Sequence, residues 1–384
     1  EIPLTKMAAF ENLLTGSKLT ERIEERIEDF NIRFDKTFHL LEAQGLDKSV
    51  IPCAQKALSN MVGSIGYWYG ESLIFQGQGN APMEVEPQSL FSGCPARSFF
   101  PRGFLWDEGF HQILISEWDL DISMDIIRHW LNLMDITGWI PREQILGSEA
   151  RSRVPPEFQP QHRDHANPPA FFLSIDKLLR KYHRTLKKEM MDTLVFKDDV
   201  VTVSEEERTN SAIQSNPTLS KLHSFFKEIY PRLDFWNSWM LESQSGVETN
   251  LFRWRGRTKD HTLTSGLDDF PRAPYPSDVE AHVDLLSWMA LSSRVLSQLS
   301  ATIGNNDAAN HNEKYHHLLQ GLEQHWDSKR NLYSDIMNIT NSNDKYSPHI
   351  GYVTMFPIMM GLIPDDSPRL LLLLEHIKDE SQMW

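Results

Sequence analysis

Cysteine is scarce in this sequence, with only Cys53 and Cys94 among 384 residues. Two cysteines are too few for a disulfide scaffold, and no CxxC pair indicates zinc or redox chemistry. The two could form one bridge, although the sequence does not place their Cα atoms. Cysteine usage therefore excludes a small disulfide-stapled domain.

Long hydrophobic runs are also missing. No run of about 18 apolar residues occurs, and the five leucines at 370–374 belong to an amphipathic helical pattern. The chain opens Glu-Ile-Pro without an apolar signal-peptide core, and its end, DESQMW, carries no stop signal. We expect no membrane span within this sequence and a chain that is cut at both ends.

Basic residues are outnumbered, with 38 Lys and Arg against 53 Asp and Glu and a net charge of -15. This balance argues against a nucleic-acid partner, because phosphate binding needs clustered Lys and Arg. It argues equally against an anionic membrane surface, and it fits a neutral or cationic ligand. Tryptophan, by contrast, is plentiful, with 11 residues. Indole rings stack on the apolar faces of sugars, but they are also common in cores.

Helical periodicity dominates the chain. In residues 17–43 an apolar stripe recurs at three- and four-residue steps through Ile23, Ile27, Phe30 and Phe34, which predicts an amphipathic helix. Strand signals are few and short. The sequence therefore predicts a mostly α architecture with paired helices, and further helices are expected near 47–68, 109–134, 168–192, 219–243, 278–303, 309–326, 350–363 and 367–379.

Long connections rich in Pro and Gly separate these helices at 78–104, 137–168 and 244–277. Loops of this length are uncommon unless they carry function, and a rigid helical scaffold is a usual support for them. The segment 196–216 is polar and has no aromatic residue after Phe196, so we expect it to be a mobile excursion.

Paired acids appear in the third of these loops, where Asp268 and Asp269 follow Ser-Gly-Leu. Asp and Gly are common in turns. Alternatively, one of the two is a general acid for glycoside hydrolysis, which needs a carboxyl group with a raised pKa. Flanking Leu267 and Phe270 would supply apolar surroundings that raise that pKa.

Just downstream, Ser277 and Glu280 have the spacing of a capping box before an apolar run. Glu280, Asp284 and Trp288 are four residues apart, so they would share one face of the helix expected at 278–303. A structural role and a ligand role both fit this pattern.

Three other segments mix aromatic, basic and acidic residues. SFFPRGFLWDEGFH (98–111) is either core aromatics at a helix start or a stacking platform in which Asp107 accepts hydrogen bonds from sugar hydroxyls. In 138–157 and FRWRGR (252–257), Arg–carboxylate pairs that hold the loops are as reasonable as ligand contacts. His162, Asp164 and His165 lack the frame of a metal site, so we expect them to be solvated. Asn338 begins the one usable glycosylation sequon.

Six of these motifs together resemble the processing α-glucosidase I family in glycoside hydrolase family 63, and they run in the family's order over roughly residues 60–375. A related pattern occurs in trehalases. The motifs are FFPRGFLWDEGFHQ, GWIPREQILGSEAR, ANPPAFFL, FRWRGR, TSGLDDFPRA and VEAHVDLLSW.

The resemblance implies an all-α (α/α)6 barrel, or toroid, with long loops on one face. Residues 1–45 would be a linker and outer helices, and residues 46–384 most of the barrel, incomplete at its C-terminal end. The family's N-terminal β-sandwich, membrane anchor and last barrel helices would be absent. Membrane contact would then come only through a segment outside this sequence.

The implied activity is inverting removal of the terminal α-1,2-linked glucose from the Glc3Man9GlcNAc2 N-glycan, without a cofactor or metal. It implies location in the lumen of the endoplasmic reticulum and an oligosaccharide of N-glycosylated proteins as partner. The alternative is a catalytically inert, glycan-binding helical module.

The resemblance assigns residue roles as well. Asp268 matches the general acid, and Ala281 stands where the family usually has Arg. We expect the distant loops to meet, so that Asp268 overlooks an aromatic wall. The expected substrate-binding residues are Phe100, Arg102, Phe104, Trp106, Asp107, Arg142, Glu143, Glu149, Trp254, Arg255, Asp269, Glu280, Asp284 and Trp288.

An inverting enzyme also needs a second carboxylate about 6.5–9.5 Å from the acid to activate water. In the family this base is a Glu in a W-E-Q-Y-like motif, and no such motif occurs before Trp384. We therefore expect the isolated chain to be inactive unless the missing N- and C-terminal parts of the enzyme are supplied.

Overall fold

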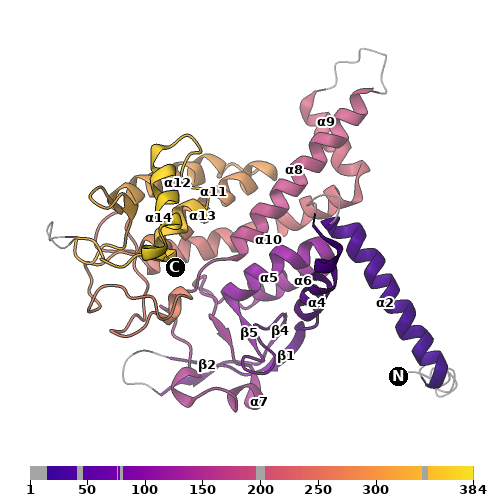
Figure 1. Ribbon diagram of the computed structural model, residues 1–384, viewed down its shortest axis with the longest axis horizontal. Helices are drawn as coiled ribbons and strands as arrows, with labels where there is room; N and C mark the ends of the chain where they lie inside the picture. Colours follow the sequence, from indigo (N-terminus) through magenta and orange to yellow (C-terminus); the bar gives the residue numbers. More distant parts are fainter. Residues whose placement is uncertain are drawn as a thin grey trace.

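Helices make up most of the computed structural model, as the periodicity predicts (Figure 1). The structure describes residues 15–40, 46–75, 77, 81–195, 204–339 and 345–383. Among the helices described there, none is long and apolar enough to cross a bilayer.

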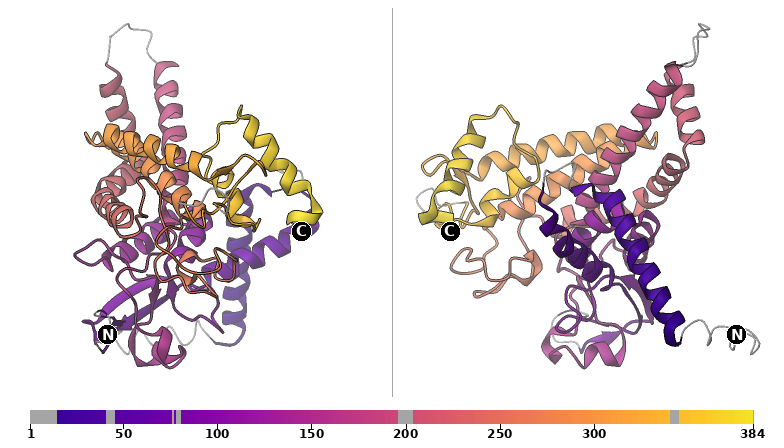
Figure 2. Two further views of the ribbon diagram at one scale, coloured as in Figure 1. Left: turned by 90° about the vertical axis from the view of Figure 1, so that its left-hand side faces the viewer. Right: turned by 45° about the vertical axis from the view of Figure 1, so that its right-hand side comes forward.

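The N-terminal helix α2 (Gly16–Phe38) projects away from the rest of the molecule (Figures 1 and 2). Its predicted apolar stripe is buried only near the end of the helix. Phe34 is 2% exposed, whereas Ile23 is 51% exposed. The indole of Trp118 lies 5.2 Å from the ring of Phe30 and anchors this end of the helix. A short 3-10 turn (Lys48–Val50) and α4 (Ile51–Val62) follow.

The middle of the chain forms α5 (Leu105–Trp118), α6 (Leu120–Asn132), α8 (Phe171–Val195), α9 (Glu205–Ser215) and α10 (Pro217–Ser243). Helix α9 corrects the prediction of a mobile excursion at 196–216. Ser204 and Glu207 cap its start reciprocally through side chain and backbone, which satisfies amide groups that have no partner within the helix. Residues 196–203 of the predicted excursion lie outside the described residues.

The last third of the chain forms α11 (Val283–Thr302), α12 (Ala308–Gln324), α13 (Tyr352–Met359), α14 (Pro368–Lys378) and α15 (Glu380–Met383). Every residue of α11 from 283 to 293 is buried. A helix that is enclosed on all sides belongs to the interior of the molecule. Helices α8, α10, α12 and α13 contact it, so the loop before α11 starts from a rigid support.

The strands are short, antiparallel and paired two by two. The pairs are β1 (Gly66–Gly70) with β4 (Gln88–Ser92), β2 (Leu73–Ile74) with β3 (Met83–Glu84), β5 (Gly103–Phe104) with β6 (Glu143–Gln144), and β7 (Trp326–Asp327) with β8 (Leu332–Tyr333). Three further short elements lie in the long loops: α7 (Gly147–Arg151) and 3-10 turns at Pro156–Phe158 and Leu263–Ser265.

One hydrophobic core runs through the helices from α5 to α14. Its largest fully buried side chains include the indoles of Trp130, Trp139, Trp236, Trp254 and Trp288. Those five tryptophans therefore have the core role that the composition left open. Both cysteines are free thiols, with Cys53 exposed and Cys94 buried.

Candidate active site

The pairing of β5 with β6 joins two of the long loops. Phe104 lies opposite Glu143 in this ladder, and the amide of Leu105 donates to the carbonyl of Arg142 at 2.9 Å. The register therefore places the aromatic motif around residue 104 directly beside the Arg-Glu dipeptide at 142 and 143. Two motifs that are about 40 residues apart become one surface.

Two guanidinium groups hold the carboxylate of Glu143. Arg102 donates to its Oε2 from Nε at 3.0 Å and from Nη2 at 2.7 Å, and Arg142 donates to its Oε1 at 2.7 Å. The side chains of Arg102 and Glu143 are 7% and 6% exposed. The contact of Arg142 with Glu143 agrees with the first of the two alternatives for 138–157, in which Arg–carboxylate contacts hold the loop.

The same arginine supports an aromatic wall. The guanidinium carbon of Arg102 lies 4.8 Å from the ring centroid of Phe104, within the range of a cation–π contact. Phe100 meets Phe104 edge-on at 5.6 Å, and Phe110 meets Trp106 in the same way at 5.3 Å. Half of the Phe100 surface remains exposed, at 47%.

The loop that carries Asp268 packs directly on this wall. A Cβ at Gly266, whose φ is +72°, would lie 2.5 Å from the indole atoms of Trp106, closer than any side chain permits. Asn167 fixes the arrangement. Its Oδ1 accepts from the Trp106 amide at 2.9 Å, and its Nδ2 donates to the Thr264 carbonyl at 3.3 Å. The expected meeting of these distant loops is confirmed.

Asp268 lies at the exposed edge of this arrangement, and its backbone carbonyl accepts from the Thr262 amide at 3.0 Å. Partial burial raises the pKa of its carboxyl group. The nearby charge of Arg142 opposes this shift, and that of Asp269 adds to it. A raised pKa keeps the proton on the acid over a wider pH range, which is what a general acid requires.

A second acid faces the same arginine. Asp107, in the first turn of α5, is half-buried, and burial raises its pKa to about 6. His111 and Arg142 oppose the shift, and the neighbouring Glu108 adds to it. Asp107 and Asp268 therefore share Arg142 as a nearby positive charge.

The start of α11 differs from the prediction. The helix begins at Val283, and no side chain caps it. Ala281 instead exchanges backbone hydrogen bonds with Ile336, at 2.9 and 2.8 Å. This bridge holds Ala281 outside the helix, so the predicted capping box is wrong. Glu280 precedes α11 and does not share its face with Asp284 and Trp288.

Glu280 lies in a buried ion pair with Arg257, with nitrogen–oxygen distances of 2.8–3.1 Å. Burial alone would raise its pKa, but His282 and Arg257 lower it to about 2. The carboxylate therefore stays ionised. Its partner Arg257 was not among the predicted site residues.

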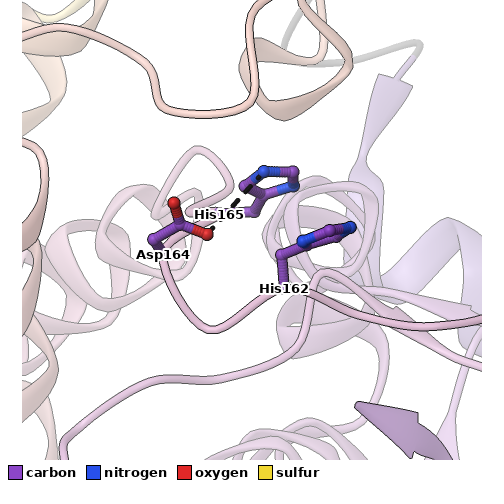
Figure 3. Close-up of side chains that lie close together, drawn as sticks. All are labelled: His162, Asp164 and His165. Atoms are coloured by element: carbon purple, nitrogen blue, oxygen red, sulfur yellow. Dashed lines mark ion pairs between the residues drawn. The ribbon is translucent and has the colours of Figure 1, made fainter. Parts of the chain in front are cut away.

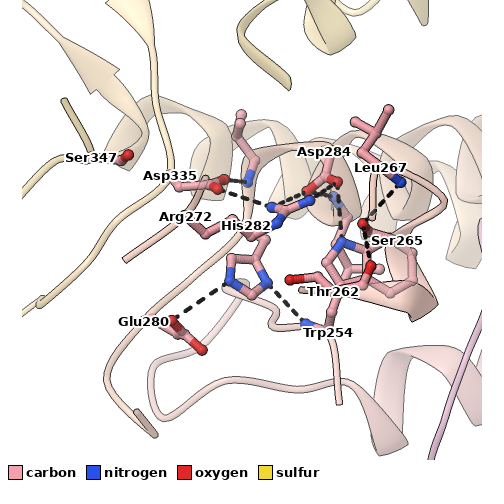
Figure 4. A network of polar contacts seen from close by, with 12 residues as sticks. Trp254, Thr262, Ser265, Leu267, Arg272, Glu280, His282, Asp284, Asp335 and Ser347 are labelled. Carbon is pink, nitrogen blue, oxygen red and sulfur yellow. Dashed lines mark hydrogen bonds and ion pairs between the residues drawn. The ribbon is translucent and has the colours of Figure 1, made fainter. Parts of the chain in front are cut away.

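Asp284 belongs to a buried network that links three parts of the chain (Figure 4). Arg272 donates to Asp284 at 2.6 and 3.1 Å and to Asp335 at 2.9 Å. The indole of Trp254 donates to Asp284 at 3.1 Å. Burial opposes ionisation of Asp284, but Arg272 keeps its pKa below the usual value.

The other predicted site residues have different surroundings. Trp288 is 0% exposed and packs on Phe356. Arg255 donates to the carbonyls of Ser243 and Ser245, at 3.0 and 2.7 Å. Glu149 is exposed on α7, and Asp269 is exposed next to Asp268. The structure thus gathers Phe100, Arg102, Phe104, Trp106, Asp107, Arg142, Glu143 and Asp268 at one surface.

A pocket of about 180 Å³ lies next to this surface. Arg142 and Leu263 belong to its lining, as do His162, His165 and His261. The charges of Arg142 and His261 both lower the pKa of Asp268, so the pocket and the acid are neighbours. The three histidines were not among the predicted site residues.

The fold and the sequence of this chain together define a glycoside hydrolase domain of the helical kind. The sequence matches the profile of the glycosyl hydrolase family 63 C-terminal domain over residues 14–384, and the chain belongs to this family.

Curated relatives give the same result. Mannosyl-oligosaccharide glucosidase GCS1 of Arabidopsis thaliana is 35% identical over 97% of this chain and 46% of its own length. The probable mannosyl-oligosaccharide glucosidase of Schizosaccharomyces pombe is 36% identical over 97% of the chain and 50% of its own length. The mannosyl-oligosaccharide glucosidase of Saccharomyces cerevisiae is 32% identical over 100% and 50%. The chain thus spans about half the length of these relatives.

Solved structures confirm the fold. The family 63 mannosylglycerate hydrolase of Thermus thermophilus, in complex with Tris and D-glycerate, superimposes with a TM-score of 0.54 at 14% identity. The likeness covers 75% of this chain and 73% of that one. The expected all-α (α/α)6 toroid is the fold of this chain.

Proposed function

We propose that this chain carries the acid side of the active site of an inverting exo-α-glucosidase. The substrate is an N-glycan capped by α-1,2-linked glucose, Glc3Man9GlcNAc2, in the lumen of the endoplasmic reticulum. Family membership and the names of the relatives support this class of reaction. The observation that carries the proposal is the packing of the Asp268 loop on Trp106 through Gly266.

In this proposal Asp268 protonates the oxygen of the leaving sugar. Its exposed position allows it to reach a ligand, and its raised pKa favours the protonated form. Phe100, Phe104 and Trp106 would stack on the apolar face of the glucose ring. Asp107 would accept hydrogen bonds from the sugar hydroxyls.

Arg142 connects these roles. It lies near both carboxyl groups and opposes the rise of their pKa values, while its own guanidinium is held by Glu143 and by the Leu263 carbonyl. In this proposal its charge limits how far the pKa values of Asp107 and Asp268 rise. Pairs of acids in distinct environments are typical of glycosidases.

The buried acids have a different role in this proposal. Glu280 forms an ion pair with Arg257, and Asp284 forms one with Arg272. The two acids therefore hold the loop that follows Asp268 and do not contact the sugar. Trp254 and Trp288 belong to the same support, because both are 0% exposed.

The water-activating base is proposed to come from outside this chain. Glu143 lies near Asp268 but is engaged by Arg102 and Arg142. A carboxylate that accepts from two guanidiniums is a poor base, because its ionised form is already stabilised. Clear turnover of a glucose-capped oligosaccharide by the isolated 384-residue chain would contradict this part of the proposal.

Asp268→Asn tests the acid in a chain of the length of the curated relatives. We expect kcat to fall by about 10²–10⁴-fold with a smaller change in ligand affinity, because Asn cannot deliver the proton. Asp269→Asn is the matched control, because Asp269 is adjacent and also exposed. An equal loss in both variants, or no loss in Asp268→Asn, would reject the assignment.

The alternative, a catalytically inert glycan-binding helical module, shares the aromatic wall but needs no proton donor. Binding of a glucose-configured iminosugar to the 384-residue chain would occur in both cases. Only the glucosidase proposal predicts that Asp268→Asn lowers turnover by about 10²–10⁴-fold, in a chain of the length of the curated relatives, while this binding persists.

A further inference from the structure

Three potential metal ligands meet at one turn on the rim of the pocket beside Arg142. The amide of His165 donates to the carbonyl of His162 at 3.1 Å, which closes the turn over 162–165. One ligand atom from each of His162, Asp164 and His165 lies within 4.8 Å of the others (Figure 3). The side chain of Asp164 is 68% exposed and that of His165 26%. Asp164 is therefore solvated as expected, whereas His162 and His165 are half-buried.

Buried donors fix the backbone of this turn. The indole of Trp139 donates to the carbonyl of His165 at 3.0 Å, and the side-chain amide of Gln244 donates to the backbone carbonyl of Asp164 at 2.8 Å. Trp139 and Gln244 are 1% and 0% exposed. Ligands on a backbone that is already held lose less conformational entropy when a metal binds.

Aromatic stacking holds the two imidazole rings. Phe75 stacks on His162 at 4.3 Å, and His162 stacks on His165 at the same distance. A Cβ at Gly256 would lie 2.4 Å from Nε2 of His165. Because glycine has no Cβ, the edge of the His165 ring can pack against the loop of the FRWRGR motif. The second imidazole is thus packed between elements from two distant loops.

We propose that His162, Asp164 and His165 form a binding site for a divalent transition metal of the Zn²⁺ type. Imidazole nitrogens with one carboxylate oxygen are ligands that Zn²⁺ accepts, whereas Mg²⁺ and Ca²⁺ prefer oxygen ligands alone. Three protein ligands leave a coordination position for water or a ligand oxygen.

The site lies at the pocket beside the proposed sugar-binding surface around Phe104, Trp106 and Arg142. Both histidines belong to the lining of the pocket of about 180 Å³, together with Arg142 and Glu157. Glu157 is an exposed carboxylate in this lining, and its negative charge would favour a cation there. The free coordination position would open toward this pocket, next to the acid rather than at it. The inference does not depend on the proposed glucosidase activity.

Isothermal titration of the tag-free 384-residue chain with Zn²⁺ tests the site. We expect one saturable equivalent, and Co²⁺ in its place should give the visible absorption of a four- or five-coordinate complex. Mg²⁺ in excess should not compete. No saturable Zn²⁺ binding would overturn the proposal.

Asp164→Asn is the main variant, because its exposed side chain can change without disturbing the packing, and His162→Ala is the second. Loss of an outer-shell partner already lowers metal affinity by about 10–100-fold, so loss of a ligand should cost at least as much. His316→Ala is the matched control, since it removes an exposed imidazole on α12. Zn²⁺ affinity that is unchanged in both ligand variants, or lowered equally in His316→Ala, would refute the assignment.

Discussion

Replacing Arg272 by Met removes the cation that two buried carboxylates share. The side chains of Arg272 and Asp284 are each 1% exposed and that of Asp335 is 2% exposed. Breaking a buried ion pair from one side costs about 3–5 kcal/mol, because the remaining charge stays buried without a partner. Two carboxylates depend on this guanidinium, so we expect Arg272→Met to lower the free energy of unfolding by about 3–5 kcal/mol at pH 7.

The pH dependence of this loss follows from the sign of the pKa shift. In the wild type Arg272 keeps the pKa of Asp284 below its usual value even though burial opposes this. That stabilisation is present above the unfolded-state pKa of about 3.9 and is lost as the pH falls through the lower folded-state value. In Arg272→Met burial is opposed only by the smaller contributions of His282 and of the Trp254 hydrogen bond, so the folded-state pKa of Asp284 should rise. The destabilisation should therefore be greatest at neutral pH and shrink in acid, where the carboxylate can accept a proton.

Urea unfolding of the wild type and the variant at several pH values measures this effect, provided that the slope m is unchanged. Asp278→Asn is the control. It breaks the ion pair with Arg253, but the Asp278 side chain is 79% exposed, and such pairs contribute only about 0–1 kcal/mol. A loss below about 1 kcal/mol for Arg272→Met at pH 7, or a loss that does not shrink in acid, would refute the reasoning.

Two further predictions concern the proposed sugar-binding surface. Gly266→Ala should weaken binding of a glucose-configured iminosugar, measured by titration, because the new Cβ would lie 2.5 Å from the Trp106 indole and displace it. Gly266 has a positive φ of +72°, so Gly304→Ala, with φ +71° and no atom within 4 Å of the new Cβ, is the control for the backbone cost. Equal affinity in both variants would contradict the contact. Affinity for the same ligand should fall as the pH drops through about 6, because burial raises the pKa of Asp107 to that value and the protonated acid accepts hydrogen bonds less well. The charges of His111, Glu108 and Arg142 also act on this carboxyl group. A pH profile that is unchanged in Asp107→Asn would exclude Asp107 as the cause.

Most helices could be predicted from the sequence because their apolar stripes repeat over many residues. The prediction failed where short-range signals compete. In 196–216 the polar composition obscured the Ser204 and Glu207 capping pair, which starts α9. At 277–280 the same kind of signal was present, but a backbone bridge from Ala281 to Ile336 prevents the helix from starting there. No local pattern reveals a partner about 55 residues away.

The candidate site was predictable where a motif contains its own contacts, and less so where it depends on a distant partner. The aromatic residues from Phe100 to Trp106 form one wall because they are close in sequence and on one strand and helix start. The pairs Arg257–Glu280 and Arg272–Asp335 join residues that are 23 and 63 positions apart. The sequence marks these residues as charged, but only the fold shows which charge each one meets.

The partner of each acid separates four of the candidate carboxylates into two kinds. Glu280, with a pKa of about 2, and Asp284, with a lowered pKa, each receive hydrogen bonds from a guanidinium. Asp268 and Asp107 have raised pKa values, and Arg142 acts on both as a nearby charge. A carboxylate that accepts hydrogen bonds from Arg has a lowered pKa and stays ionised near neutral pH, whereas partial burial raises the pKa of an acid and favours its protonated form. The acids that resemble one another in sequence therefore have different electrostatic surroundings, and Asp268, the proposed proton donor, belongs to the pair with raised pKa values.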